Sequence, residues 1–271
     1  MSKSADLLEA DSHFAFGKNW ASYSKLVTDA RVEEAVASLH RLAGGELSGM
    51  RFLDIGCGSG LHSLAALRLG AAEVVAVDID ADSVATTRAL LEAHASGQRW
   101  SVTQRSVFDP QIGSLGTFDV VYSWGVLHHT GDMYRALRSA AALVRPGGRF
   151  IFALYRQTSL CWFWKFEKRW YAQASEAGQA RARALYLKLF KLLNRRTFKD
   201  YVANYAQVRG MDFYHDVHDW LGGWPYESIS PAQTDSLMQQ LGLQRIRTFL
   251  APGGSTGLLG SGNDEYVYAR P

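Results

Sequence analysis

The fold of this chain is decided by one stretch, Phe52-Leu53-Asp54-Ile55-Gly56-Cys57-Gly58-Ser59-Gly60. Apolar residues lead into three alternating glycines, and an amphipathic run (61–69) follows, which predicts a buried strand, a tight turn and a helix. Glycine lets the backbone approach a ligand without a Cβ in the way, and a helix start offers unpaired amide donors. A second apolar run (74–77) ends on Asp78, whose carboxylate suits a ribose diol. These parts together predict a nucleoside-binding site.

The glycine spacing distinguishes two kinds of nucleoside. A dinucleotide-binding turn has the pattern G-x-G-x-x-G, whereas here the glycines stand at 56, 58 and 60, with Leu61 in place of the third glycine of that pattern. Asp54 precedes the turn, and no Lys or Arg lies in the turn to offset its repulsion of a pyrophosphate. A carboxylate in this place attracts an ammonium group instead, and S-adenosylmethionine carries an ammonium group, a ribose and a sulfonium. The turn therefore favours S-adenosylmethionine over a dinucleotide.

Four motifs in order carry a resemblance to a known family over about residues 50–155. They are Leu53 to Gly60, Val77-Asp78-Ile79-Asp80, Phe118 to Ser123 followed by Val126-Leu127-His128-His129, and Leu143 to Phe150. With these motifs the chain resembles the class I S-adenosylmethionine-dependent methyltransferases, in the branch that holds small-molecule and ubiquinone- or menaquinone-type enzymes. The resemblance implies an α/β, Rossmann-like fold with a mostly parallel seven-stranded sheet and helices on both faces.

The resemblance also implies which residues surround the cofactor. The expected contacts are Asp54, Gly56, Cys57, Gly58 and Gly60 at the methionine end, Asp78 and Ile79 at the ribose, Ser106 and Val107 at the adenine, Ser123 and Trp124 at the floor, and Trp20 near the sulfonium. One position departs from the family pattern. The family often has Gly-Asp at the end of the third strand, where this chain has Arg105-Ser106, so either Ser106 or Asp109 is left to bind the adenine.

Candidate catalytic residues are fewer, because methyl transfer needs mainly alignment and exclusion of water, and a base only when the acceptor must lose a proton. The candidates are His128, His215, His218 and Tyr23. His128 and His129 follow the fourth strand, where they either take part in catalysis or shape the loop. His215 and His218 lie one helical turn apart. Three interpretations compete for this pair: a metal site, a substrate-binding or base cluster, and a hydrogen-bonded network. No ligand spacing supports a metal, and none is predicted.

The chain divides into four predicted parts: an N-terminal helical cap (1–48), a cofactor-binding core (49–155), a helical insertion rich in aromatic residues (156–229) and the C-terminal part of the sheet (230–271). In the core, strands are expected at 51–55, 73–77, 100–106, 118–123 and 149–155, alternating with helices. The insertion is expected to form a lid or pocket wall that suits an apolar or aromatic acceptor. Its basic run beside leucines (188–199) fits a membrane or partner surface, but a solvated helix face is favoured.

Composition narrows the class of protein further. The chain has 271 residues, 47% of them hydrophobic and 20% charged, and a formal net charge of +3, which is too mild to predict a nucleic-acid partner. The two cysteines, Cys57 and Cys161, lie far apart, and a reducing compartment is expected. No leader or membrane span is recognised. A cytoplasmic monomer or homodimer is expected.

The sequence thus predicts a methyltransferase that uses S-adenosylmethionine, with S-adenosylhomocysteine as the product. The acceptor would be an oxygen, sulfur or nitrogen atom of a small molecule, attacked by in-line displacement. Two alternatives stay open: an RNA or protein methyltransferase, and a regulator that binds S-adenosylmethionine without turnover.

Overall fold

A computed structural model describes residues 28–203, 205, 213–251 and 256–271, so Trp20 and Tyr23 lie outside the described residues. Its centre is one seven-stranded sheet in the order β3-β2-β1-β4-β5-β7-β6. The strands are β1 Arg51–Ile55, β2 Glu73–Asp78, β3 Trp100–Gln104, β4 Phe118–Trp124, β5 Val144–Tyr155, β6 Gln244–Phe249 and β7 Asn263–Ala269. Neighbouring strands from β1 to β5 pair in parallel, while β7 is antiparallel to β5 and β6. This arrangement confirms the predicted fold class.

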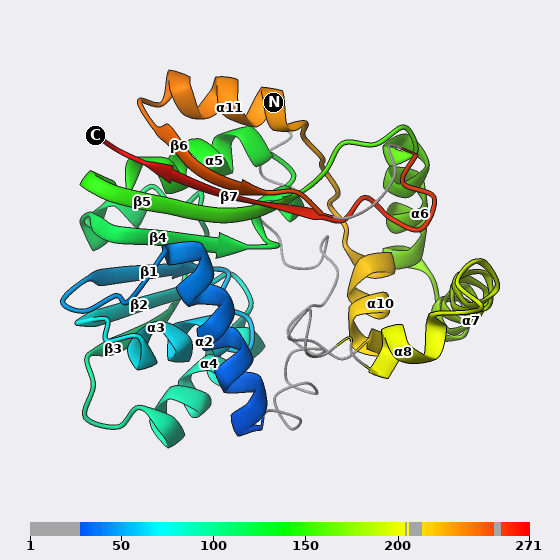
Figure 1. Ribbon diagram of the computed structural model, residues 1–271, viewed down its shortest axis with the longest axis horizontal. Helices are drawn as coiled ribbons and strands as arrows, with labels where there is room; N and C mark the ends of the chain where they lie inside the picture. The colour runs from blue at the N-terminus through cyan, green and yellow to red at the C-terminus, as the bar shows by residue number, and fades with distance from the viewer. Residues whose placement is uncertain (1–27, 204, 206–212, 252–255) are drawn as a thin grey trace.

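Helices cover both faces of the sheet (Figure 1). On one face lie α2 Asp29–Ala43, α3 Leu61–Arg68 and α4 Ala81–His94, and on the other lie α5 Met133–Ala142 and α11 Pro231–Gln240. Successive strand residues point to opposite faces. Phe52 therefore belongs to the core under α2–α4, and its neighbour Leu53 to the core under α5 and α11. Both residues are fully buried, as expected for strands covered on both sides.

The insertion forms a separate group of helices beyond the carboxyl ends of the parallel strands, at the right of Figure 1. It contains α6 Cys161–Gln173, α7 Glu176–Leu193, α8 Phe198–Ala203 and α10 Phe213–Gly222. It has a core of its own, in which Trp164, Tyr171, Phe213 and Val217 pack with Tyr155 from the end of β5. The helical, aromatic-rich insertion after the fifth strand is therefore confirmed as a structural unit.

The first and last residues of the insertion meet at the carboxyl end of β5. Gln157 N donates to Ile229 O at 3.0 Å, and Ile229 N donates to Tyr155 O at 3.1 Å. Beside this junction, Arg156 Nε donates to both carboxylate oxygens of the fully buried Asp264, each at 3.0 Å. The base of the insertion is thereby fixed to β5 and β7.

The described part of the glycine-rich connection between β6 and β7 packs against the insertion. Trp164 Nε1 donates to Gly257 O at 2.7 Å, and Tyr186 Oη donates to Leu259 O at 2.7 Å. Within the described residues, no helix is both long and apolar enough to cross a membrane.

Strand boundaries in the core differ from the predicted ones by two or more residues at two places. β3 ends at Gln104 instead of 106, so Ser106 lies in the turn that follows. β5 begins at Val144, which pairs with Phe118 before an irregularity, and regular pairing resumes at Arg149. The Pro-Gly-Gly run (146–148) in this segment resembles a turn in the sequence, because proline and glycine are the usual turn residues.

Candidate functional site

The glycine turn adopts the geometry that the sequence predicts. Gly56, Gly58 and Gly60 have φ values of 77°, 53° and 82°, in the left-handed region. A Cβ on Gly56 would lie 2.4 Å from a methyl group of Val126, and a Cβ on Gly60 would lie 3.0 Å from the backbone of Thr87. Gly60 is the N-cap of α3, and no side-chain hydrogen bond caps the start of this helix. The first amide groups of α3 therefore face the carboxyl edge of the sheet.

Asp54 is the last but one residue of β1 and is almost fully buried. Its Oδ2 accepts a hydrogen bond from Ser63 Oγ at 2.6 Å. Burial, with a smaller contribution from the nearby charge of Asp78, raises the pKa of Asp54 to about 7 against the lowering effect of this hydrogen bond. Among the described residues Asp54 forms no ion pair. A buried carboxylate in this state is stabilised by a cation, so the site fits a ligand with an ammonium group.

Asp78 is held in one orientation at the end of β2. Gly58 N donates to its Oδ2 at 3.0 Å, and Asp80 N donates to its Oδ1 at 2.9 Å. Burial raises the pKa of Asp78 to about 6, and these two backbone hydrogen bonds oppose the shift. The carboxylate is therefore joined to the glycine turn itself. Ile79 follows directly, and its carbonyl oxygen accepts from Gln104 Nε2 at 2.9 Å.

Cys57 has a packing role within the turn. Thr87 Oγ1, on α4, lies 3.3 Å from Cys57 Sγ and donates to Gly58 O at 3.0 Å. Burial, together with the charges of Asp78 and Asp54, raises the pKa of the Cys57 thiol well above its usual value. Thr87 thus holds the glycine turn in place through its side chain, and no sequence motif predicted this role.

At the predicted adenine end, Ser106 and Asp109 have different surroundings. Ser106 Oγ accepts from Phe108 N at 3.1 Å and keeps its own hydrogen as a donor, and Val107 is buried in the core under α5. The Asp109 carboxylate accepts from Gln111 N at 2.7 Å and lies 3.5 Å from Arg105 Nε. This engagement of Asp109 leaves Ser106 as the better candidate for a contact with the base.

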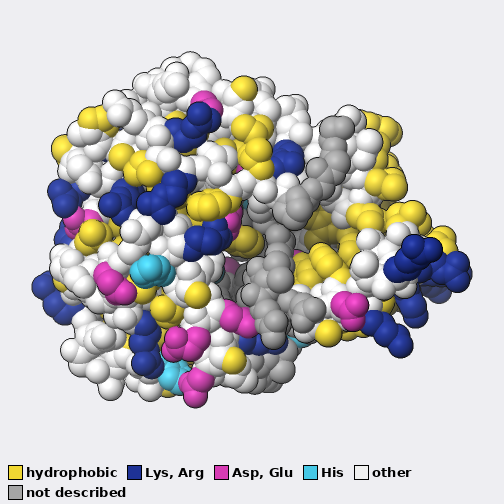
Figure 2. Space-filling view, viewed as in Figure 1, with side chains coloured by type: hydrophobic (Ala, Val, Ile, Leu, Met, Phe, Trp, Pro, Cys, Tyr) yellow, Lys and Arg dark blue, Asp and Glu magenta, His cyan; other side chains and the backbone are white. Residues whose placement is uncertain are grey.

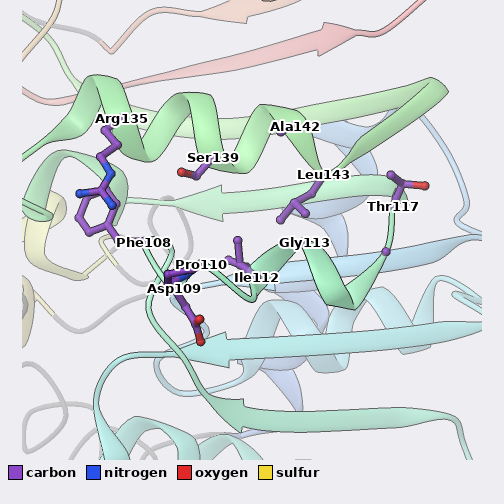
Figure 3. Close-up of a pocket in the computed structure, with 11 residues that line it drawn as sticks. Phe108, Asp109, Pro110, Ile112, Gly113, Thr117, Arg135, Ser139, Ala142 and Leu143 are labelled. Carbon is purple, nitrogen blue, oxygen red and sulfur yellow. The ribbon is translucent and has the colours of Figure 1, made fainter.

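A groove of about 470 Å³ runs from Phe108 along α5 to Thr117 (Figure 3). Arg135 lies over the ring of Phe108, 4.6 Å from its centroid, at one end of the groove. Asp109 lines this groove, but the other predicted cofactor residues do not. The groove is therefore a feature separate from the predicted cofactor site.

The two predicted floor residues lie at the end of β4. Ser123 is fully buried and donates from Oγ to Ile55 O at 2.9 Å, directly before the glycine turn. Trp124 donates from Nε1 to Glu265 Oε1 at 2.9 Å. Ser123 thus supports the glycine turn through its hydrogen bond to the backbone of β1. The indole of Trp124 is hydrogen-bonded to a residue of β7.

His128 is fully buried after β4 and packs on Tyr155, with 3.9 Å between the ring centroids. Its Nδ1 accepts from Tyr155 N at 3.3 Å, so the neutral ring carries its hydrogen on Nε2. Burial lowers the pKa of His128 well below its usual value, and the charges of His129 and Lys168 lower it further. Nε2 has no hydrogen-bond partner within the part of the chain that the structure describes.

Lys168 is fully buried and faces this histidine from the insertion. Its Nζ lies 3.6 Å from the ring centroid of Trp220, 5.4 Å from that of Tyr226 and 5.8 Å from that of Tyr155. Neither Lys168 Nζ nor Trp220 Nε1 has a hydrogen-bond partner among the described residues. Burial lowers the pKa of Lys168, whereas the carboxylates of Glu167, Asp216 and Asp219 oppose this.

Family membership follows from comparison with known proteins. A family model described as a methyltransferase domain matches residues 28–205, which is more than half of the chain. The chain belongs to the methyltransferase domain family. The match includes the glycine turn, Asp78, His128 and Lys168, and therefore most of the site described above.

Curated relatives of this methyltransferase domain match it over part of its length. The ubiquinone biosynthesis O-methyltransferase of Xanthomonas euvesicatoria pv. vesicatoria (strain 85-10) is 36% identical over 113 residues, or 42% of this chain and 46% of the relative. The protein of the same name from Caulobacter sp. (strain K31) is 36% identical over 130 residues, or 46% of this chain and 50% of the relative. The chain thus spans about half the length of the curated relatives it matches.

Solved structures share the fold of the domain at low identity. The magnesium protoporphyrin IX methyltransferase from Synechocystis PCC 6803, crystallised with bound S-adenosylhomocysteine, has a TM-score of 0.53 and 19% identity, with 89% of this chain and 82% of that chain covered. A methyltransferase in complex with the Haloferax volcanii Trm112 methyltransferase activator has a TM-score of 0.54 and 17% identity, with 94% and 95% covered. At these identities the likeness concerns the fold alone.

The predicted histidine pair of this methyltransferase domain lies on α10, away from the glycine turn. His218 Nδ1 lies 2.7 Å from Tyr171 Oη and 3.1 Å from Arg183 Nη1, which join it to α6 and α7. Burial, together with the charges of Arg183 and His215, lowers the pKa of His218 to about 4. These contacts favour the hydrogen-bonded network over the other two interpretations. Among the described residues no group of His, Cys, Asp or Glu is arranged to hold a metal ion.

Proposed function

We propose that this chain transfers a methyl group from S-adenosylmethionine to a small-molecule acceptor, with S-adenosylhomocysteine as the product. The observation that carries the proposal is the buried Asp54, which lacks an ion pair among the described residues and stands beside the glycine turn and Asp78. A ligand with an ammonium group and a ribose satisfies both carboxylates at once. Crystallised structures with this fold hold such a ligand, as the bound S-adenosylhomocysteine of the Synechocystis enzyme illustrates.

The residues around the cofactor divide its binding between them. Asp54 would bind the ammonium group and the first amides of α3 the carboxylate, because a helix start attracts negative charge. Asp78 would accept from the ribose hydroxyls, with its orientation set by Gly58 and Asp80. Ile79, Ser106 and Val107 would surround the adenine. When bound, S-adenosylmethionine supplies an electrophilic methyl group on a sulfonium.

We place the acceptor between the carboxyl ends of β4 and β5 and the helices α6 and α10. His128 and Tyr155 form the floor of this space, and Lys168 and Trp220 enter it from the insertion. These aromatic rings favour a flat or apolar acceptor. The Nζ of Lys168 and the Nε2 of His128, both without hydrogen-bond partners among the described residues, favour an acceptor with an oxygen that carries or develops negative charge.

The tautomer of His128 limits what it can do. Because Nδ1 already accepts from Tyr155 N, the ring presents an N–H donor from Nε2 and has no free lone pair for a proton. We therefore assign His128 the positioning of the acceptor oxygen. Lys168 is the better candidate for taking up a proton, because burial favours its uncharged form. The ring stacking and burial around both residues exclude water from the reacting atoms.

The proposal also includes the broader expectations from the sequence. We infer a cytoplasmic enzyme that acts as a monomer or homodimer on a small molecule and needs no nucleic acid. The ubiquinone biosynthesis O-methyltransferases, which match part of the chain, carry an oxygen-directed reaction in their name. Their similarity supports oxygen as the attacked atom without identifying the acceptor.

Calorimetry with S-adenosylhomocysteine tests the proposal directly. Asp78→Ala should weaken binding by about 1–3 kcal/mol, because the substitution strands hydrogen-bonding groups of the ligand. Asp82→Ala is the matched control, since Asp82 lies in the first turn of α4 and its carboxylate takes no part in the contacts of Asp78. Absence of binding to the unaltered protein would refute the proposal. Binding without a methylated product over a broad acceptor panel would support a non-catalytic regulator instead.

A further inference from the structure

One side of the insertion exposes large apolar side chains. On α6, Trp162, Phe166 and Trp170 recur at four-residue spacing, which places them on one face. They are 71%, 73% and 50% exposed. The opposite face carries Trp164 and Tyr171, which are buried in the core of the insertion. The exposed aromatic residues therefore contribute little to holding the fold together.

Helix α7 repeats this arrangement. None of its residues is buried, and Leu185 is 70% exposed. Leu189 and Leu192 follow at spacings of four and three residues and are also exposed, so the three leucines form one stripe. We call Trp162, Phe166, Trp170, Leu185, Leu189 and Leu192 together the exposed α6–α7 face.

The charge of the same segment is strongly positive. Residues 161–203 contain ten Lys and Arg and three Asp and Glu, a net charge of +7. The whole chain carries +3, so all other residues together carry −4. Figure 2 shows hydrophobic side chains over α6 and a cluster of Lys and Arg over α7 and α8 at the same end of the molecule. The exposed basic residues of this segment are Lys165, Arg169, Arg181, Lys188, Lys191, Arg195, Arg196 and Lys199.

We propose that the exposed α6–α7 face docks this protein on an anionic phospholipid membrane. Tryptophan, phenylalanine and leucine beside lysine and arginine are the composition of helices that lie in the plane of a bilayer surface. The apolar side chains would enter the boundary between headgroups and acyl chains. The basic residues would pair with anionic lipid headgroups, whose surface potential attracts them. The attachment is peripheral.

The charge of the face speaks against a second copy of the chain as its occupant. An isologous dimer would bring two segments of net charge +7 into contact. A nucleic acid would match the charge, but its binding does not call for an exposed leucine stripe. A membrane surface complements both properties of the face. The interpretation of the basic run as a solvated helix face is therefore replaced by one in which its apolar residues have a partner.

Vesicle flotation of the full chain tests the inference. We expect the protein to float with vesicles of phosphatidylcholine and phosphatidylglycerol and to remain behind with vesicles of phosphatidylcholine alone. Binding should weaken as salt rises, because salt screens the electrostatic part. The measurement needs neither cofactor nor acceptor, so failure of the proposed methyl transfer would leave this test unaffected.

Two pairs of double variants separate the apolar and charged contributions. Trp162→Ser/Phe166→Ser should abolish flotation. Tyr134→Ser/Ile246→Ser, which removes two exposed hydrophobic side chains outside the insertion, should not. Lys188→Glu/Lys191→Glu should weaken binding by roughly a factor of five for each unit of charge lost. Its control is Arg68→Glu/Arg138→Glu, at exposed positions on α3 and α5.

Several outcomes would overturn the inference. One is a lack of flotation with the anionic vesicles at low salt. Another is normal vesicle binding by Trp162→Ser/Phe166→Ser together with loss in the charge variant, which would indicate a general polyanion surface such as one for nucleic acid. A third is a concentration-dependent dimer, lost in Trp162→Ser/Phe166→Ser, in a protein that does not float with vesicles.

Discussion

The cofactor side and the acceptor side of the proposed site differ in whether their buried polar groups have hydrogen-bond partners. On the cofactor side, side-chain oxygens are joined to the protein: Asp78 to two backbone amides, Asp54 to Ser63 and Ser123 to Ile55. On the acceptor side, Lys168 Nζ, His128 Nε2 and Trp220 Nε1 lack hydrogen-bond partners in the part of the chain that is described. An unpaired buried polar group is costly. We infer that the proposed cofactor site is preformed, whereas the proposed acceptor site is completed by what it binds.

Gly56→Ala tests the preformed half and should have the largest effect. A Cβ at this position meets Val126 at 2.4 Å, and φ is 77°. We expect loss of detectable binding of S-adenosylhomocysteine in calorimetry and a fall in the free energy of unfolding of about 2–4 kcal/mol, from backbone strain and overpacking. Gly97→Ala is the control, because its φ is 84° with nothing within 4 Å of the added Cβ. Equal losses in both variants would show that backbone strain alone, without the contact between the added Cβ and Val126, accounts for the effect.

Asp54→Asn should separate ligand binding from stability. Affinity for S-adenosylhomocysteine should fall about 10–100-fold through loss of a charged hydrogen bond. The pKa of Asp54 is raised to about 7, so the folded state binds more protons than the unfolded state between pH 4 and 7. Asp54 therefore destabilises the ligand-free protein as pH rises through this range, and the variant should gain stability relative to the parent, measured by urea unfolding.

Asp119→Asn is the control of opposite sign for Asp54→Asn. Burial raises the pKa of Asp119, but the hydrogen bond from Arg51 N and the contact with Arg145 outweigh it and hold the pKa low. Its contribution to stability is present above the unfolded pKa and is lost as pH falls. A loss of stability in Asp54→Asn at pH 8 would contradict the role assigned to the buried charge.

Lys168→Met tests the incomplete half. Replacing an unpaired buried polar group by an apolar one of similar size is often neutral or stabilising. We expect equal or greater stability at pH 7, unchanged binding of S-adenosylhomocysteine and a large loss of methyl transfer. The pKa of Lys168 is lowered by burial, so the unfolded state binds more protons between that pKa and about 10.4.

The parent should therefore gain stability relative to Lys168→Met as pH rises through that window, by up to about 1.4 kcal/mol per pH unit. Lys165→Met, on the exposed side of α6, should show neither effect. The carboxylates of Glu167, Asp216 and Asp219 lie near Lys168 and oppose the lowering of its pKa by burial. A pH-independent difference between parent and variant would mean that Lys168 does not lose its proton in the folded state.

The smallest expected effect is a difference in reactivity between the two cysteines, one in the core and one in the insertion. Burial and two nearby carboxylates raise the pKa of Cys57. At Cys161 burial also raises the pKa, but hydrogen bonds with Ser228, Thr158 and Tyr226 outweigh it and lower the pKa overall. Iodoacetamide should therefore label Cys161 about ten-fold faster than Cys57 in the folded protein, because the thiolate is the nucleophile. In urea the two rates should converge, as peptide mapping would show.

The core was predictable because its strands are buried on both sides. Such strands appear in the sequence as continuous apolar runs, and each ends at a recognisable residue, such as Gly56 after β1 or Asp78 at the end of β2. The same reasoning places the predicted cofactor residues that lie within the described part of the chain along one edge of the sheet.

The acceptor side was less predictable, since it depends on contacts between distant segments. Lysine is almost never fully buried, so nothing in the sequence distinguishes Lys168 from the exposed Lys165 of the same helix. Ser63 and Thr87 support the site through side-chain hydrogen bonds whose partners are known only from the fold. The spacing of His215 and His218 was read correctly as one helical turn, but only the structure shows that His218 contacts Tyr171 and Arg183.

The junction at which Tyr155 and Gln157 bond to Ile229 has an evolutionary consequence. The insertion leaves the sheet and returns to it at one point, so a helical segment of different length or sequence could occupy the same place without altering the register of any strand. If the insertion binds the acceptor and the membrane as proposed, a single exchange between genes at these two boundaries would change both partners. The cofactor chemistry would be inherited intact.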